Sequence, residues 1–165
     1  MKALVVYESL WGNTARIAGA IAEGIGREAR ALSTAAATGD EVADADLIVA
    51  GAPVFGFKLS SEKMRQSIRA NPGKAPAAPD LSHPAMRAWL AELPPGHGRS
   101  AAFDTQVRGP FGSGAPEIAE LLQAAGYTPL GEPVGFMLKG KYGPLRDGEV
   151  ERAREWGAEL AAALA

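Results

Sequence analysis

The feature that most constrains the fold is the alternation of short apolar segments with segments of helical periodicity. The first apolar segment, Ala3 to Tyr7, is too short for a helix and contains β-branched residues. Beyond a polar segment, Ile17, Ile21 and Ile25 recur at a spacing that places them on one face of a helix. A short strand with no polar face is typical of a parallel sheet that is covered on both sides.

The same alternation continues along the chain. We expect further strands at 29–32, 47–51, 100–103 and 134–138, and further helices at 60–68, 84–93, 116–125 and from 147 onward. In this interpretation Pro53 ends the third strand, and Asn13 or Thr14 caps the first helix. Residues 71–84 hold four prolines and predict an irregular connection. A loop of this length in a small domain is often functional.

The length of the chain fits one domain, residues 1–165. No repeat and no second composition regime interrupts it. Strands that alternate with helices predict right-handed crossovers and a parallel sheet with helices on both faces. We therefore expect an α/β protein with three layers.

Composition and charge exclude several classes of function. The formal net charge is −2, whereas a protein that mainly binds nucleic acid needs a clear surplus of Lys and Arg. Cysteine is absent, which excludes disulfides, thiol catalysis and zinc–thiolate sites and agrees with a reducing compartment. The apolar run near the N-terminus is too short for a signal peptide or a membrane span. We expect a cytoplasmic protein.

The segment between the first strand and the first helix has the composition of a phosphate site. It reads Ser9, Leu10, Trp11, Gly12, Asn13 and Thr14. The first backbone N–H groups of a helix and its dipole favour an anion, and Gly12 allows a close approach of the chain. The side chains of Ser9, Asn13 and Thr14 can donate hydrogen bonds to phosphate oxygens. From these residues alone, a capped turn that binds nothing is an equally good interpretation.

This strand–loop–helix segment resembles the phosphate loop of flavodoxin-like FMN-binding proteins of the short-chain flavodoxin type. The resemblance implies a flavodoxin-like three-layer sandwich, with five parallel strands in the order 2-1-3-4-5 and noncovalently bound FMN. Most members of the family carry Thr at the position of Trp11. Tyr or Trp stands there in the flavin domains of flavodiiron proteins and of tetrameric NAD(P)H:quinone oxidoreductases. The replacement removes one hydroxyl ligand and keeps the backbone donor.

The resemblance also implies that the flavin ring lies between the loops after the third and fourth strands. After the third strand stand Pro53, Val54, Phe55, Gly56 and Phe57. Either Phe55 or Phe57 stacks on the ring, or packs in the core or at an interface. After the fourth strand stand Asp104, Thr105, Gln106 and, further on, Phe111. This second loop lacks the family consensus, so its residues are assigned by position.

Other folds and sites that bind similar ligands require residues that this chain lacks. A receiver domain needs paired acids after the first strand, where this chain has only Glu8, and the first turn has neither a P-loop Lys nor Gly-x-Gly-x-x-Gly. His83 and His97 stand among Pro and Gly without the partner spacing of a metal site. We expect both to be solvated, and we predict no metal site and no catalytic side chain.

Basic residues follow the predicted third strand: Lys58, Lys63, Arg65, Arg69 and Lys74. They predict a mixed or basic rim around the flavin, which would favour the anionic reduced flavin and raise its reduction potential. A solvated helix face is the better interpretation for Lys63 and Arg69.

Three functions follow from the resemblance. The first is electron transfer through FMN, with a redox partner protein or an NAD(P)H-linked reductase as partner. The second is an FMN-dependent NAD(P)H:quinone reductase, which needs room for a second ligand over the ring and is usually an oligomer. The third is an interaction module of the same fold that has lost flavin.

Overall fold

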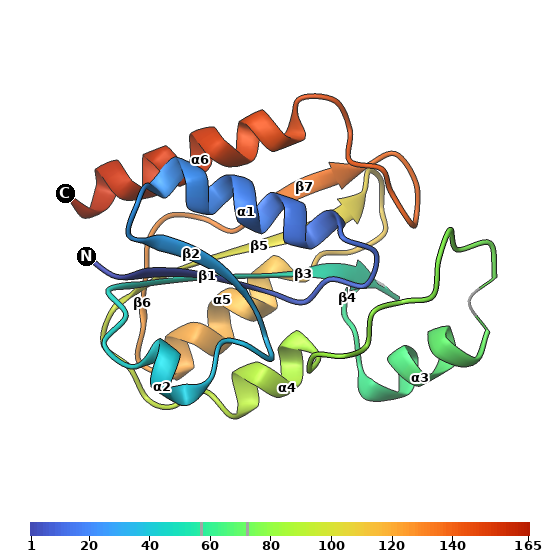
Figure 1. Ribbon diagram of the computed structural model, residues 1–165, viewed down its shortest axis with the longest axis horizontal. Helices are drawn as coiled ribbons and strands as arrows, with labels where there is room; N and C mark the ends of the chain where they lie inside the picture. Colours follow the sequence, from blue (N-terminus) through green and yellow to red (C-terminus); the bar gives the residue numbers. More distant parts are fainter. Residues whose placement is uncertain (57, 72) are drawn as a thin grey trace.

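The computed structural model describes residues 1–56, 58–71 and 73–165, and it has one sheet between two layers of helices (Figure 1). The strands are β1 (Ala3–Tyr7), β2 (Ala29–Ser33), β3 (Leu47–Phe55), β4 (Lys58–Leu59), β5 (Arg99–Val107), β6 (Thr128–Pro129) and β7 (Val134–Leu138). The helices are α1 (Asn13–Ile25), α2 (Gly39–Val42), α3 (Glu62–Ala70), α4 (Met86–Ala91), α5 (Ala115–Ala124) and α6 (Glu149–Leu164). The predicted α/β architecture is confirmed.

The sheet runs in the order β2-β1-β3-β5, and both β6 and β7 pair with the far side of β5. All of these pairs are parallel, whereas β4 forms an antiparallel hairpin with the end of β3. The sheet therefore differs slightly from the expected order 2-1-3-4-5. The outermost position is divided between β6 and β7, and the β4 hairpin is added.

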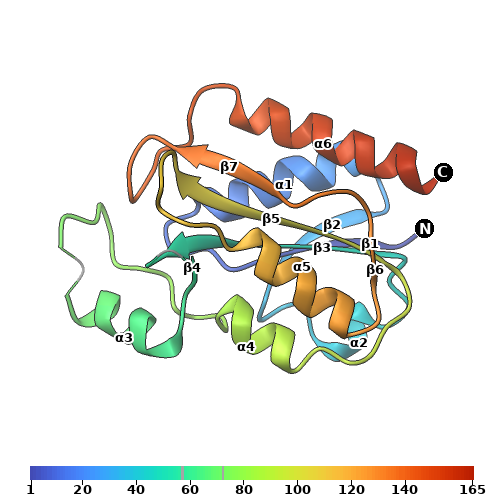
Figure 2. The same ribbon diagram turned by 180° about the vertical axis from the view of Figure 1, so that it is seen from behind.

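The two layers of helices bury opposite faces of the same strands. Helices α1 and α6 cover one face, and α2, α4 and α5 cover the other (Figures 1 and 2). Val5, Val49 and Phe103 belong to the core beneath α1 and α6. Leu4 and Ile48 point the other way and pack with α4 and α5. Successive residues of a strand face opposite sides, so the alternate burial explains why these strands are apolar throughout.

Helices α1 and α6 approach each other closely at Gly157. A Cβ atom at that position would lie 2.2 Å from the carbonyl oxygen of Ile21, so only glycine allows this approach. Ala153 and Leu160, one turn to either side of it on α6, are buried in the same contact. The N-terminal helix is therefore held by the C-terminal helix over its length.

Two strands continue further than the sequence predicts. β3 passes through Pro53 and ends at Phe55, and β5 ends at Val107 rather than at residue 103. The pairing of β3 with β1 stops at Gly51, so the missing N–H of Pro53 breaks no bond to β1. The two extended ends pair with each other up to Pro53 and Thr105. Pro53 therefore does not end the strand.

Helix starts were the less accurate part of the prediction. The N-cap of α1 is Gly12, so neither Asn13 nor Thr14 caps it. Pro84 is not the first helical residue, because α4 begins at Met86 after the extended Ala85. The hydroxyl of Ser61 accepts the N–H of Met64 and begins α3 two residues later than expected.

Two residues named in the prediction lie outside the described residues. They are Phe57, one of the two alternatives for stacking on the flavin, and Pro72 in the irregular connection. Among the residues that the structure describes, no helix has both the length and the apolar character needed to cross a membrane.

Candidate functional site

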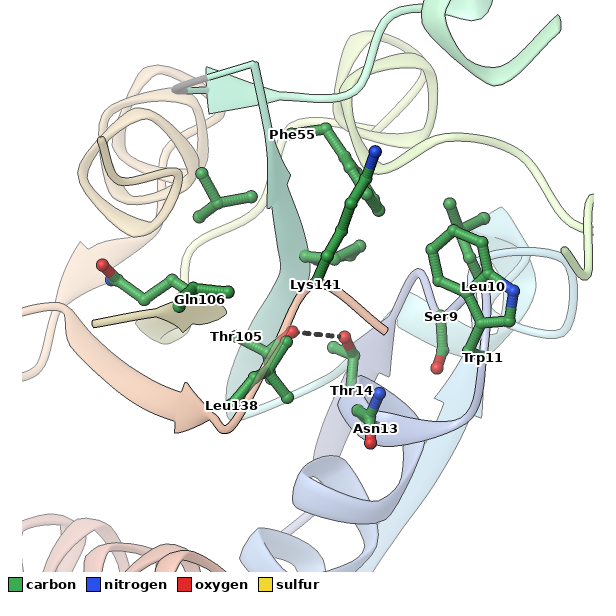
Figure 3. Close-up of a pocket in the computed structure, with 13 residues that line it drawn as sticks. Ser9, Leu10, Trp11, Asn13, Thr14, Phe55, Thr105, Gln106, Leu138 and Lys141 are labelled. Carbon is green, nitrogen blue, oxygen red and sulfur yellow. Dashed lines mark hydrogen bonds between the residues drawn. The ribbon is translucent and has the colours of Figure 1, made fainter. Parts of the chain in front are cut away.

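The carboxyl ends of β1, β3 and β5 meet at a small cavity of about 30 Å³ (Figure 3). Ten residues predicted from the sequence line it: Ser9, Leu10, Trp11, Asn13, Thr14, Pro53, Val54, Phe55, Thr105 and Gln106. Three further lining residues were not predicted: Val107, Leu138 and Lys141. Leu138 and Lys141 come from the end of β7 and the connection after it, which sequence reasoning did not connect with the site.

A more apolar groove of about 260 Å³ continues from this cavity. It shares five lining residues with the cavity, and it adds Gly56 and Phe111. The ring of Phe111 is 50% exposed, whereas Phe55 is only 8% exposed. The site therefore has a polar end at the start of α1 and an apolar end between β3 and the connection after β5.

The chain turns into α1 through Gly12, whose φ of 91° lies in the left-handed region. A residue with a Cβ atom is strained in that conformation. The N–H of Gly12 donates to the Ser9 hydroxyl at 3.1 Å, which closes the turn. Gly12 does not line the cavity itself. Its turn places the first N–H groups of α1, which have no partner within the helix, beside the cavity.

Two buried hydroxyls lie at the polar end. Thr14 Oγ1 and Thr105 Oγ1 share a hydrogen bond of 2.8 Å between α1 and β5 (Figure 3). One of the two hydroxyl hydrogens makes this bond, so the other is available to donate to a ligand. Thr105 was predicted from its position alone, and the structure places it at the polar end of the site, beside the start of α1.

The 9–14 segment is held from both sides by distant parts of the chain. The indole N–H of Trp11 donates to the carbonyl oxygen of Ala77, and the side-chain amide of Asn13 donates to that of Tyr142, each at 3.0 Å. The Trp11 ring meets the Tyr142 ring edge-on at a centroid distance of 4.8 Å and the Phe55 ring at 5.9 Å. The irregular connection therefore contacts the 9–14 segment at Ala77 and Asp80.

A buried charged group lies beneath the segment. The carboxylate of Glu8 accepts hydrogen bonds from the Ser60 hydroxyl at 2.7 Å and from the Met86 N–H at 2.9 Å. Arg65 Nε lies 3.6 Å from it. Burial raises the pKa of Glu8, and the two hydrogen bonds and Arg65 oppose that rise. Arg65 is buried in this contact, so it does not contribute to a basic rim.

His83 also belongs to this support. Its Nε2 accepts the N–H of Ser9 at 3.0 Å, and its carbonyl oxygen accepts from Arg65 at 2.6 Å. Burial lowers the pKa of His83, with a smaller opposing effect of Asp80. The expectation that His83 is solvated is therefore wrong. Its partner is 74 residues away, so no local pattern indicates the contact.

Asp104 is predicted at the site and lies outside the cavity. It is fully buried in β5, where one carboxylate oxygen accepts from Ser113 Oγ and from the N–H groups of Gly114 and Ala115. The other oxygen accepts from the Gln106 amide at 2.7 Å. Asp104 therefore caps the start of α5 and orients Gln106, and it lines neither the cavity nor the groove.

His97, the other histidine, is exposed and precedes β5 at the opposite end of the sheet. Within residues 1–56, 58–71 and 73–165, no three His, Asp or Glu side chains are grouped so that they could hold a metal ion.

Comparisons with known proteins agree with this architecture. A family model described as "Flavodoxin domain" matches residues 4–76, which include the 9–14 segment and the end of β3. A solved flavodoxin from the domain Archaea is 22% identical, with a TM-score of 0.67 and 99% of each chain covered. A flavodoxin, WrbA-like protein from Agrobacterium tumefaciens is 20% identical, with a TM-score of 0.61 and coverage of 99% of this chain and 96% of that one.

Rubredoxin oxygen:oxidoreductase from Desulfovibrio gigas is 18% identical, with a TM-score of 0.62. The match covers 99% of this chain and 36% of that protein. No match was found among curated protein sequences. At these identities the solved structures show a common fold.

Proposed function

Because the chain has a flavodoxin-like fold and its residues 4–76 match a flavodoxin domain model, we propose that it binds FMN noncovalently in this cavity and transfers electrons through it. The observation that carries the proposal is that the 9–14 segment and the ends of β3 and β5 converge on one site. That site has a polar end at a helix N-terminus and an apolar end lined by aromatic rings, which is the distribution of polarity along FMN itself.

The residues present fit the two ends of FMN. The first N–H groups of α1 and the hydroxyls of Thr14 and Thr105 supply hydrogen bonds for the phosphate. Val54 and Phe55 on one side and Gln106 and Phe111 on the other supply surfaces for the ring. When bound, FMN supplies one- and two-electron redox chemistry, and the chain supplies binding, orientation and exclusion of water.

The partner proposed for this function is a redox protein or an NAD(P)H-linked reductase that docks at the apolar end. The groove there is open, and the half-exposed ring of Phe111 lies on it. A flavin ring edge that a partner can reach through such a groove suits electron transfer between proteins.

The same groove favours one alternative, an FMN-dependent NAD(P)H:quinone reductase. Its volume of about 260 Å³ offers space for a second planar ligand beside Phe55 and Phe111. An NADH–quinone assay combined with size-exclusion chromatography separates the two functions. A monomer that does not oxidise NAD(P)H would contradict the reductase, whereas turnover by an oligomer would favour it over electron transfer alone.

The decisive experiment is the visible spectrum of the purified protein, followed by titration of the apoprotein with FMN and with riboflavin. We expect tight FMN binding and weaker riboflavin binding. Thr14→Val should weaken FMN binding about tenfold through loss of one hydrogen bond. Thr38→Val is the matched control, because Thr38 is exposed at the start of α2 and makes no side-chain cap bond.

Failure to bind FMN at micromolar concentrations would contradict the proposal. The fold would stand, and the function to pursue would then be that of an interaction module without flavin.

A further inference from the structure

One charged side chain enters a site that is otherwise neutral. Among the described residues that line the cavity and the groove, Lys141 is the only one with a charged side chain, and it lines both spaces. The 9–14 segment contains no Lys or Arg. A phosphate held at the start of α1 would therefore meet hydrogen-bond donors and a helix dipole from that segment, but no full positive charge.

The connection after β7 holds Lys141 in a defined place relative to the 9–14 segment. The carbonyl oxygen of the next residue, Tyr142, accepts the Asn13 amide, and its ring packs on Trp11. Lys139 N–H donates to the carbonyl oxygen of Pro144 at 2.8 Å, which closes the connection into a tight turn. Lys141 therefore starts from a backbone that is tied to the phosphate end of the site.

The side chain of Lys141 lies between the two ends. Figure 3 shows it extending over the end of β3 toward Phe55. Its Nζ lies 5.5 Å from the centre of the Tyr142 ring. In the part of the chain that the structure describes, it pairs with no carboxylate, whereas its neighbour Lys139 lies 3.4 Å from Asp147. The ammonium group is thus available to an anionic ligand.

The position of Lys141 allows contact with a phosphate at the polar end. Its side chain borders the small polar cavity and is exposed, so it can change its rotamer. A rotamer that turns toward α1 would bring the ammonium group to a phosphate held there. An ammonium that moves beside a phosphate in a partly dry site forms a charge-assisted hydrogen bond with it.

We propose that Lys141 pairs with the phosphate of bound FMN and makes the site select phosphorylated over unphosphorylated flavin. This inference rests on the proposed function. It identifies a specificity-determining residue from the connection after β7, outside the 9–14 segment and the ends of β3 and β5 that carry the proposed flavin site.

The experiment is a titration of four apoproteins with FMN and with riboflavin, followed by flavin fluorescence: the wild type, Lys141→Met, Lys141→Arg and Lys139→Met. Methionine keeps the length of the lysine side chain and removes its charge. We expect Lys141→Met to weaken FMN binding at least about tenfold, to leave riboflavin binding unchanged, and to reduce the salt dependence of FMN affinity. Arginine should restore most of the FMN affinity, and Lys139→Met should behave as the wild type.

Each other outcome overturns the inference. Unchanged FMN affinity in Lys141→Met would show that the ammonium does not contact the phosphate. An equal loss of FMN and riboflavin would place Lys141 against the ring. If the wild type itself binds no FMN, the proposed function fails and the inference fails with it, whereas wild-type binding with an unchanged variant overturns the inference alone. Thermal unfolding of the variants confirms that the exposed substitution leaves the fold intact.

Discussion

The polar and apolar ends of the site are built in opposite ways. At the polar end, Ser9, Trp11 and Asn13 each make a hydrogen bond to a residue at least 66 positions away in the sequence. At the apolar end, Gly56 and Phe111 are exposed, and the groove between them is open. The polar end is therefore fixed before a ligand arrives, whereas the apolar end can adapt to what lies against it.

This difference indicates how affinity and function divide between the two ends. A preformed set of donors loses little conformational entropy on binding, so the polar end suits a ligand that stays bound. An open apolar surface suits contacts that form and break with a partner. We expect substitutions at the polar end to act on cofactor affinity, and substitutions at the apolar end to act on both cofactor and partner.

The largest effect should come from a negative charge at the polar end. Asn13→Asp would place a carboxylate near the bound phosphate. At a separation of ~5 Å and an effective dielectric constant of about 20, the two negative charges repel each other by about 3 kcal/mol. This repulsion corresponds to roughly 100-fold weaker FMN binding. Asn13→Ala is the control, because it removes the bond to Tyr142 without adding charge. Titration with both flavins checks this. Unchanged FMN affinity in Asn13→Asp would move the phosphate away from α1.

Substitutions of the two aromatic rings at the apolar end should have smaller effects on flavin affinity, and the effects should differ between the two rings. Phe55→Ala should weaken FMN and riboflavin binding equally, by about five- to tenfold for a stacking contact of ~1 kcal/mol, and should also destabilise the fold because Phe55 is buried. Phe111→Ala should leave the fold intact and reduce electron transfer to a partner. Chemical unfolding and flavin titration of both variants test this. Selective loss of FMN, but not of riboflavin, in Phe55→Ala would contradict it.

The smallest effect concerns the support of the polar end. Because burial lowers the pKa of His83, its neutral form stabilises the folded state above the ordinary value of 6.5, and this stability is lost as the pH falls through the lowered pKa. Protonation of Nε2 would break its bond to the Ser9 N–H, a loss of about 1 kcal/mol.

His83→Gln, whose carbonyl can still accept a hydrogen bond, should flatten this part of the pH dependence. His97→Gln should not, because His97 is exposed. Urea unfolding of the three proteins between about pH 5 and 8 makes the comparison. If the free energy of unfolding had the same pH dependence in the wild type and in His83→Gln, protonation of His83 would not contribute to the pH dependence of stability.

The sequence predicts the parts of this molecule whose signal is local. The strand at Val134–Leu138 is recovered with its bounds, because a short apolar run between turn residues leaves few alternatives. The 9–14 segment is found for a similar reason, since Gly12 and the small polar residues around it are contiguous. Ten of the residues named from the sequence then line a single cavity.

The remaining parts depend on contacts between distant residues. Asp104 follows an apolar run as a binding residue would, yet it accepts hydrogen bonds from the start of α5. Glu8 follows β1 and Arg65 lies in α3, with α1, β2, α2, β3 and β4 between them, so they meet only when the sheet forms. Lys141 lies in the connection after the last strand, which contains Gly and Pro, and no local pattern indicates that its side chain enters the site.

The close contact at Gly157 gives the site a property that its own residues do not determine. Since α6 packs directly against α1 there, detaching α1 from the sheet would break the buried contact with α6. The two helices should open as one cooperative unit, and the amides that are hydrogen-bonded within α1 should exchange their hydrogens with solvent mainly in that joint opening. The placement of the donors at the start of α1 thus depends on the opposite end of the chain, on a helix that does not line the cavity.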